Sequence, residues 1–270
     1  MNHRQIAVCS WSLQPKNPID LATKVQTCGL KNVQLALNPL ITNKIWDDVS
    51  NILGDFGIDI LSGMLEASGE DYTSLETIAQ TGGVRQDMTW KDTFHNAQRV
   101  AAKAAELEID LVTFHAGFFP EENYMERQKM IDRVGEILDY FSGYGVNLAF
   151  ETGQETPINL ISILKEINHS TLGVNFDPAN MILYGKGNPI EAIQLLSSWI
   201  RQVHIKDARH AKVPGTWGEE VPVGDGDFCW KSFLSFIDTS TNLVIEREGG
   251  EQRVDDVITA FQLLKGLDAC

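Results

Sequence analysis

Four residues that could bind a metal ion stand at the ends of four consecutive β-like runs in the second half of the chain. They are Glu151, Asp177, His204 and Glu246. The first two intervals each equal about one strand-plus-helix unit, and the third equals a unit plus an insertion. Equivalent positions on neighbouring strands would bring all four side chains to one end of a sheet. Three carboxylates placed so closely would repel one another without a cation, so the pattern predicts a metal site.

The ligand types indicate what kind of metal site this would be. Three carboxylates and one imidazole suit Mn²⁺, Mg²⁺ or Co²⁺, and Zn²⁺ is also compatible, whereas a structural zinc site would be richer in thiolates. Four ligands leave coordination positions open for substrate oxygens, so a catalytic site is expected. Taken singly, each residue has another explanation: a solvated glutamate, a helix-capping Asp177 or a core His204.

The elements that must position these residues alternate between apolar runs and amphipathic segments. Each strand candidate is almost continuously apolar, as expected for a parallel sheet covered on both faces. The predicted strands are 5–10, 32–37, 58–63, 110–115, 146–151, 172–177, 200–205 and 242–247, and the clearest predicted helices are 19–28, 94–106, 124–140, 158–167, 190–199 and 254–264. Eight such units predict a single-domain (β/α)8 TIM barrel over residues 1–270.

An open doubly wound sheet is the second possibility for the fold. It would more often carry a glycine-rich turn after its first strand, which the segment CSWSLQP does not provide. Two insertions, near 66–88 and 207–229, follow predicted strand ends and are therefore expected to lie over the active-site face.

Charge and cysteine usage narrow the choice of partners. The chain of 270 residues has a net charge of −15, which disfavours nucleic acid and anionic membranes. Its four cysteines are dispersed, and no apolar run reaches the roughly 18 residues of a membrane span. We therefore expect a cytoplasmic protein, and the family resemblance described next implies a small-molecule carbohydrate substrate. Whether it forms a homo-oligomer is left open.

Five segments carry a family resemblance over nearly the whole chain. AFETG, NFDPAN, VHIKD, VPVGDGDFCW and VIEREG, at 149–153, 175–180, 203–207, 221–230 and 244–249, together resemble the xylose isomerase-like TIM barrels. Within these, the chain looks most like the sugar phosphate isomerase/epimerase group, which includes ketose 3-epimerases and inosose dehydratases. The resemblance implies that Glu151, Asp177, His204 and Glu246 bind one divalent ion. It also implies that Glu151 and Glu246 are the catalytic acid/base pair.

Several further residues could contact the substrate. The resemblance favours this role for His115, at the end of the fourth strand, over a buried structural one. Lys206 shares a side of its strand with His204, although a simple ion pair is equally compatible. Glu155 follows Glu151 in a loop. Trp11 could stack on a sugar or pack in the core, and Arg209 could bind an anion or form an exposed salt bridge.

The expected reaction is proton transfer through an enediolate, catalysed by a sugar or sugar phosphate isomerase/epimerase. A dehydratase or lyase of the inosose dehydratase type would use the same groups to expel a hydroxyl. A non-catalytic sugar-binding barrel is the third possibility. The related family-2 AP endonucleases bind three metals, but Asn180 replaces one of their histidines, which disfavours DNA repair. Pro157 stands where ketose epimerases often place a second glutamate, so no particular ketohexose is indicated.

Overall fold

Eight parallel strands close into a barrel in the computed structural model, which describes residues 4–213 and 215–268. The order around the barrel is β1-β10-β7-β6-β5-β4-β3-β2. These strands are β1 (Ile6–Cys9), β2 (Asn32–Ala36), β3 (Asp59–Leu65), β4 (Leu111–Phe114), β5 (Asn147–Glu151), β6 (Leu172–Phe176), β7 (Ile200–Ile205) and β10 (Asn242–Ile245). Each lies within two residues, at either end, of a strand predicted from the sequence, so the expected TIM barrel is confirmed.

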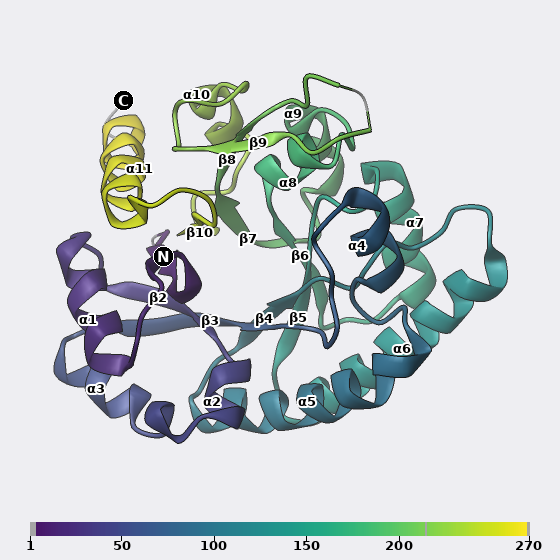
Figure 1. The fold of residues 1–270 in the computed structure, drawn as a ribbon, viewed down its shortest axis with the longest axis horizontal. Helices are drawn as coiled ribbons and strands as arrows, with labels where there is room; N and C mark the ends of the chain where they lie inside the picture. Colours follow the sequence, from purple (N-terminus) through teal and green to yellow (C-terminus); the bar gives the residue numbers. More distant parts are fainter. Residues whose placement is uncertain (1–3, 214, 269–270) are drawn as a thin grey trace.

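Helices surround the strands, as Figure 1 shows. The longer ones are α1 (Pro18–Thr27), α3 (Val49–Asp55), α4 (Leu75–Thr81), α5 (Asp87–Glu106), α6 (Tyr124–Gly143), α7 (Pro157–Ile167), α9 (Pro189–Leu196) and α11 (Arg253–Asp268). Short pieces complete the set: η1 (Ser10–Leu13), α2 (Asn38–Thr42), η2 (Lys44–Trp46), α8 (Pro178–Leu183) and α10 (Trp230–Leu234). None of these described helices is both long and apolar enough to cross a membrane.

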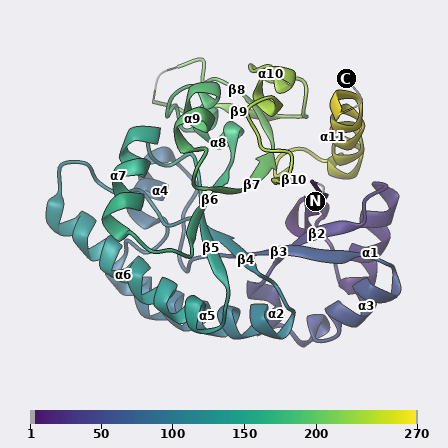
Figure 2. The same ribbon diagram turned by 180° about the vertical axis from the view of Figure 1, so that it is seen from behind.

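The first and last strands of the barrel pair with each other. Ile6 lies opposite Leu243, and Val8 lies between Ile245 of β10 and Val33 of β2. The C-terminal helix α11 lies near the N-terminal strands in both views (Figures 1 and 2). The closed ring therefore places the end of β10 beside the end of β1.

Most apolar side chains pack between the strands and the helices, but the inside of the barrel also contains polar side chains. Gln34, Ser62, Asn175 and Gln202 are buried there. Ser62 donates a hydrogen bond to Gln202 at 2.7 Å, and Gln202 donates one to Asn175 at 3.2 Å. These bonds satisfy the Ser62 hydroxyl, the Gln202 amide and the Asn175 side-chain oxygen, which would otherwise be costly to bury.

The two insertions contain structure that the sequence did not predict. Segment 66–88 contains α4, whose N-terminus has a capping box between Ser74 and Thr77. Segment 207–229 contains a two-stranded antiparallel sheet of β8 (Asp207–Arg209) and β9 (Glu219–Val221). Asp207 Oδ2 secures the following turn by accepting bonds from the Gly224 and Gly226 amides and the Trp230 indole.

Candidate metal centre and active site

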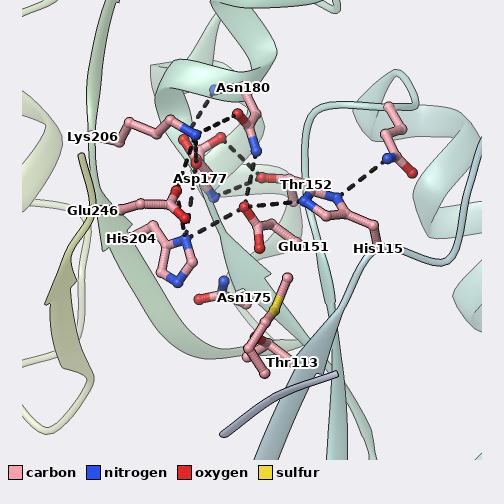
Figure 3. A network of polar contacts seen from close by, with 12 residues as sticks. Thr113, His115, Glu151, Thr152, Asn175, Asp177, Asn180, His204, Lys206 and Glu246 are labelled. Atoms are coloured by element: carbon pink, nitrogen blue, oxygen red, sulfur yellow. Dashed lines mark hydrogen bonds and ion pairs between the residues drawn. The ribbon is translucent and has the colours of Figure 1, made fainter. Parts of the chain in front are cut away.

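The four predicted metal ligands meet at the carboxyl ends of β5, β6, β7 and β10. His204 Nδ1 lies 3.3 Å from Glu246 Oε2, 3.4 Å from Glu151 Oε1 and 3.9 Å from Asp177 Oδ2. All four side chains are at most 3% exposed. One ligand atom from each lies within 4.8 Å of the others, an arrangement that could hold a metal ion (Figure 3).

The donor atoms of this cluster fit a divalent cation. Glu151 Oε2, Asp177 Oδ2, His204 Nδ1 and Glu246 Oε2 are buried and have no hydrogen-bond partner. Burial lowers the pKa of His204, but the surrounding negative groups outweigh this and raise the pKa well above its usual value. The cluster therefore favours a positive charge at its centre, and a divalent ion with three oxygen donors and one nitrogen donor would supply it.

Gln34 fixes the orientation of the His204 ring. Gln34 Nε2 donates to the Gly63 carbonyl at 3.2 Å and to Thr113 Oγ1 at 2.9 Å, so its Oε1 faces His204. His204 Nε2 lies 2.8 Å from that oxygen and must carry the proton. Nδ1, which faces the three carboxylates, is therefore the ring nitrogen that can give up its proton and offer a lone pair to a metal.

Cys9 lies near His204 but on the other side of the ring. Its Sγ is 3.8 Å from His204 Nε2, the nitrogen that bonds Gln34. Cys9, His204 and Glu246 form a second possible ligand group. Burial raises the pKa of the Cys9 thiol far above its usual value, which disfavours the thiolate that a metal requires. The carboxylate-rich group is the better metal site.

Lys206 brings a fixed positive charge to the cluster. Its Nζ lies 3.0 Å from Glu246 Oε2 and 3.8 Å from Asp177 Oδ2, and it also pairs with Glu248. The side chain is only 2% exposed. Burial disfavours the charge, but Glu246, Glu248 and Asp177 outweigh it, so the pKa of Lys206 is raised. Lys206 and His204 in turn hold the pKa of Glu246 well below its usual range despite burial.

Asn180 connects two parts of the cluster. Its Nδ2 donates to Glu151 Oε1 at 2.9 Å, and its Oδ1 accepts from Lys206 at 3.2 Å. The first turn of α8 holds it there, because Asp177 Oδ1 accepts a bond from the Asn180 amide and Pro178 occupies the first helical position. Gly153 makes room: a Cβ there would lie 2.4 Å from Asn180 Cβ. Asp177 thus combines a helix-capping oxygen with an oxygen that faces the cluster.

His115 and Trp11 lie beside the two glutamates. His115 Nε2 is 3.6 Å from Glu151 Oε1, and Gln154 Nε2 lies 3.2 Å from its other ring nitrogen. The Trp11 indole N–H donates to Glu246 Oε1 at 2.8 Å. Each glutamate therefore has one oxygen held by these neighbours; of the other two oxygens, Glu151 Oε2 has no hydrogen bond and Glu246 Oε2 faces Lys206 and His204.

Two residues predicted to bind substrate lie apart from these contacts. Glu155 Oε1 accepts a bond from the Phe119 amide at 3.1 Å, and burial raises the pKa of Glu155 to about 7. Arg209 lies on β8 with an exposed side chain, and its Nε donates to the Asp225 carbonyl at 2.9 Å. Their roles toward a substrate remain predictions, and no described contact joins either residue to the metal ligands.

A cavity of about 250 Å³ opens beside the cluster. Its walls include Trp11, His115 and Glu246 from the predicted site. They also include residues that the sequence did not single out: Glu66, Glu70, Tyr72 and Glu248. Glu70 accepts bonds from the Gly83 amide at 2.8 Å and from the Tyr72 hydroxyl at 3.2 Å. The 66–88 segment therefore contributes directly to the cavity next to the cluster.

A larger hollow of about 680 Å³ lies against α6 and α7. The arginine in its wall, Arg127, is paired with Glu166 and bonds Asn159 and Ser162. No group of potential metal ligands among the described residues lies there. The chemistry of the side chains therefore assigns the candidate site to the smaller cavity.

Comparison with known families identifies the fold family. A family model for the xylose isomerase-like TIM barrel matches residues 23–266. The chain belongs to this family. Its members among solved structures include a xylose isomerase domain protein from Planctomyces limnophilus, which is 28% identical with a TM-score of 0.87 and 98% and 96% coverage of the two chains.

Two more distant solved structures show the same fold. A D-tagatose 3-epimerase-like protein is 18% identical with a TM-score of 0.76, covering 98% of this chain and 97% of that one. The probable 3-DHS dehydratase AsbF from Bacillus anthracis is 16% identical with a TM-score of 0.77, covering 97% and 98%. Two curated relatives match at 39% and 28% identity, and the chain spans only 32% and 57% of their length.

Proposed function

We propose that this xylose isomerase-like protein is a divalent-metal-dependent sugar epimerase or isomerase. The proposal rests on one arrangement: Glu151 Oε1 and Glu246 Oε2 approach His204 Nδ1 from different strands, at 3.4 and 3.3 Å. Two carboxylates so placed can remove a proton from a carbon next to a carbonyl and return one from another direction. The epimerase-like neighbour supports this reading as an analogy of fold.

Each residue has a defined part in this reaction. Glu151, Asp177, His204 and Glu246 would hold the ion, which would polarise the substrate carbonyl and acidify the neighbouring C–H bond. Glu246 and Glu151 move the proton. Lys206 lies 3.0 Å from Glu246 and would stabilise negative charge developing on substrate oxygens. His115, 3.6 Å from Glu151, is placed to donate a hydrogen bond to a substrate hydroxyl.

The same groups could catalyse dehydration, in which removal of the proton is followed by loss of a neighbouring hydroxyl. One neighbour in fold is described as a probable 3-DHS dehydratase, which supports dehydration as the alternative reaction by analogy of fold. The two reactions differ in what the substrate carbon receives: a proton in epimerisation and a double bond in dehydration. Mn²⁺ or Mg²⁺ is the expected ion, because oxygen donors dominate the site.

The proposal can be tested by following solvent deuterium into the substrate. The Mn²⁺-loaded protein is incubated in D₂O with ketoses, ketose phosphates and inososes, and products are examined by mass spectrometry and NMR. Uptake of deuterium at the carbon beside the carbonyl, without loss of water, supports an epimerase or isomerase. Loss of water from the substrate supports the dehydratase instead.

Matched variants separate chemistry from binding. Glu151→Gln and Glu246→Gln should each reduce deuterium uptake by at least about a hundredfold, because general acid–base groups contribute roughly that much. Glu251→Gln, at an exposed position in the loop before α11, is the control and should behave as wild type. Full turnover by the Glu246→Gln protein at saturating Mn²⁺ would refute the assignment.

A further inference from the structure

A second cavity adjoins the cavity beside the cluster. It has a volume of about 210 Å³, and the two cavities share Trp11 and Ala36 in their walls. The segments after β1 and β2 form it: Pro15 follows η1, Pro39 and Leu40 belong to α2, and Trp46 ends η2. None of the residues described so far as metal ligands lines this second space.

The two cavities differ sharply in chemistry. Glu66, Glu70, Glu246 and Glu248 line the first, so its walls accept hydrogen bonds from hydroxyl groups. The walls of the second contain no charged side chain and are formed mainly by tryptophan, proline and leucine. Such a surface binds the C–H face of a ring or an aromatic group and offers little to a charged one.

Trp11 forms the boundary between the cavities, and its orientation is fixed. Its indole N–H donates a hydrogen bond to Glu246 Oε1 at 2.8 Å, and its side chain lines both cavities. A ligand that occupies both spaces would therefore have a polar part close to the metal ligands and an apolar-faced part beyond the Trp11 ring.

The walls of the two cavities themselves offer little positive charge to an anionic ligand. No lysine or arginine is present among the residues that line them. The two nearby buried cations are already paired: Lys206 with Glu246 and Glu248, and Arg247 with Glu220 and Asp256. A bound divalent ion would be offset by its three carboxylate ligands, so a phosphate or carboxylate in the first cavity would still meet the acidic walls formed by Glu66, Glu70 and Glu248.

We propose that the natural substrate is a neutral glycoside whose polyhydroxylated reacting ring carries a carbonyl group, with that ring in the carboxylate-lined cavity and its second ring or aglycone in the Trp11–Trp46 cavity. The first cavity, at about 250 Å³, corresponds in size to one monosaccharide ring. The glycoside proposal rests on the proposed function only in assigning which ring reacts. Its test does not require turnover.

A fluorescence titration with matched ligands tests the two-part site. The Mn²⁺-loaded protein is titrated with 4-nitrophenyl β-D-glucoside, whose nitrophenyl group quenches tryptophan emission at short range, and N-acetyltryptophanamide corrects for absorbance. Methyl β-D-glucoside and 4-nitrophenyl β-D-glucuronide are then compared by competition. The first lacks the aromatic group, and the second carries a carboxylate on the same ring.

We expect saturable quenching by the nitrophenyl glucoside and at least about tenfold weaker binding of each comparison ligand. Trp46→Ala should reduce the affinity for the nitrophenyl glucoside to that for the methyl glucoside, with Trp46→Phe intermediate. Ile45→Ala, an exposed neighbour, is the control. Thermal unfolding shows whether each variant is folded. If the Trp46 variants do not fold, the comparison of the three ligands on the wild-type protein still tests the proposal.

Equal binding of the methyl and nitrophenyl glucosides would overturn the apolar part of the proposal. Equal or tighter binding of the glucuronide would overturn the neutral part. If quenching follows the expected order but no sugar takes up deuterium, the proposed reaction fails and the two-part site stands. If deuterium enters free sugars and their phosphates equally well and the nitrophenyl group adds nothing, the reaction stands and the glycoside proposal fails.

Discussion

The Oε1 atom of Gln34 accepts a hydrogen bond of 2.8 Å from His204 Nε2, on the side of the ring away from the carboxylates. Because Gln34 Nε2 is itself bonded to the Gly63 carbonyl and Thr113, the amide cannot turn over without losing bonds. A residue of β2 thus determines which nitrogen of a β7 histidine is available to a metal. Partners of this kind usually matter for metal affinity as well as for orientation.

Replacing Gln34 with leucine should weaken Mn²⁺ binding by about 10- to 100-fold, because His204 would lose the bond that fixes its tautomer. Isothermal titration calorimetry of the metal-free protein with Mn²⁺ measures the change. Gln80→Leu, at an exposed position, controls for the general effect of the substitution. An unchanged Mn²⁺ affinity in the Gln34 variant would show that the tautomer is fixed in another way.

Replacing Asp177 with asparagine should abolish metal binding without unfolding α8. An asparagine oxygen can still accept the Asn180 amide bond that caps this helix, whereas alanine cannot. We therefore expect Asp177→Ala to be less stable than Asp177→Asn by about 0.5–2 kcal/mol in urea unfolding with chelator present. Equal stabilities of the two variants would argue against the capping role.

The effect of Asp177→Asn on the free energy of unfolding should also depend on whether the metal is present. Burial raises the pKa of Asp177, although Lys206 opposes the shift, so the ionised form is costly without a bound cation. In chelator, the asparagine variant should be at least as stable as wild type. With excess Mn²⁺, only the wild type should gain stability, because only it binds the ion tightly. A similar gain by both proteins would contradict this.

Glu155 should make folding less favourable as the pH rises. Its folded pKa of about 7 lies above the unfolded value of 4.5, so the folded state binds this proton more tightly. The associated stability is fully present below pH 4.5 and is lost as the pH rises through 7. Relative to Glu155→Gln, the wild type should lose up to about 3 kcal/mol between pH 4.5 and 8.

Urea unfolding of the two Glu155 proteins across this pH range measures the difference. Other titrating groups are common to both and cancel in the comparison. Glu121→Gln, an exposed residue, should follow the wild-type curve throughout. Parallel curves for wild type and Glu155→Gln would mean that the pKa of Glu155 is ordinary.

Gly153→Ala should displace Asn180 and thereby disturb Glu151. Gly153 has a φ of 127°, where side chains are strained, and an added Cβ would lie 2.4 Å from Asn180 Cβ. We expect a loss of roughly 2–4 kcal/mol in stability and weaker Mn²⁺ binding. Gly135→Ala, inside α6 with open space around it, should instead stabilise by about 1 kcal/mol. Similar behaviour of both variants would contradict the steric argument.

The sequence was most informative about the barrel strands, because burial on both faces alone determines their apolar pattern. The apolar runs predicted all eight barrel strands, since a strand buried on both faces leaves a continuous apolar signature. The positions of Glu151, Asp177, His204 and Glu246 on those strands then placed them together. Short helices such as α2 are too brief to show a helical period, and the sequence pattern did not predict them; α8 was indicated only by Asp177 as a possible helix cap.

Other parts of the site depend on contacts that the chain order does not reveal. Gln34 is a polar residue within the apolar run NVQLAL, and that anomaly was the available signal. Asn180 was interpreted only as a missing histidine, but it bridges Glu151 and Lys206. Glu70 and Tyr72 line the cavity from a segment without regular secondary structure, so no hydrophobic periodicity could predict their position. Glu155 and Arg209 lie close in sequence to the metal ligands Glu151 and His204, but the sequence did not show in which direction their side chains point.

The pairing of β1 with β10 has a consequence for the order of assembly. Trp11 and Glu246 are 235 positions apart, yet they share a hydrogen bond across the seam where the barrel closes. A nascent chain that has not yet emerged past β10 cannot form this contact or complete the metal-ligand group. We therefore expect the metal to bind at the end of folding rather than nucleate it, with ring closure as the step that creates an active catalyst.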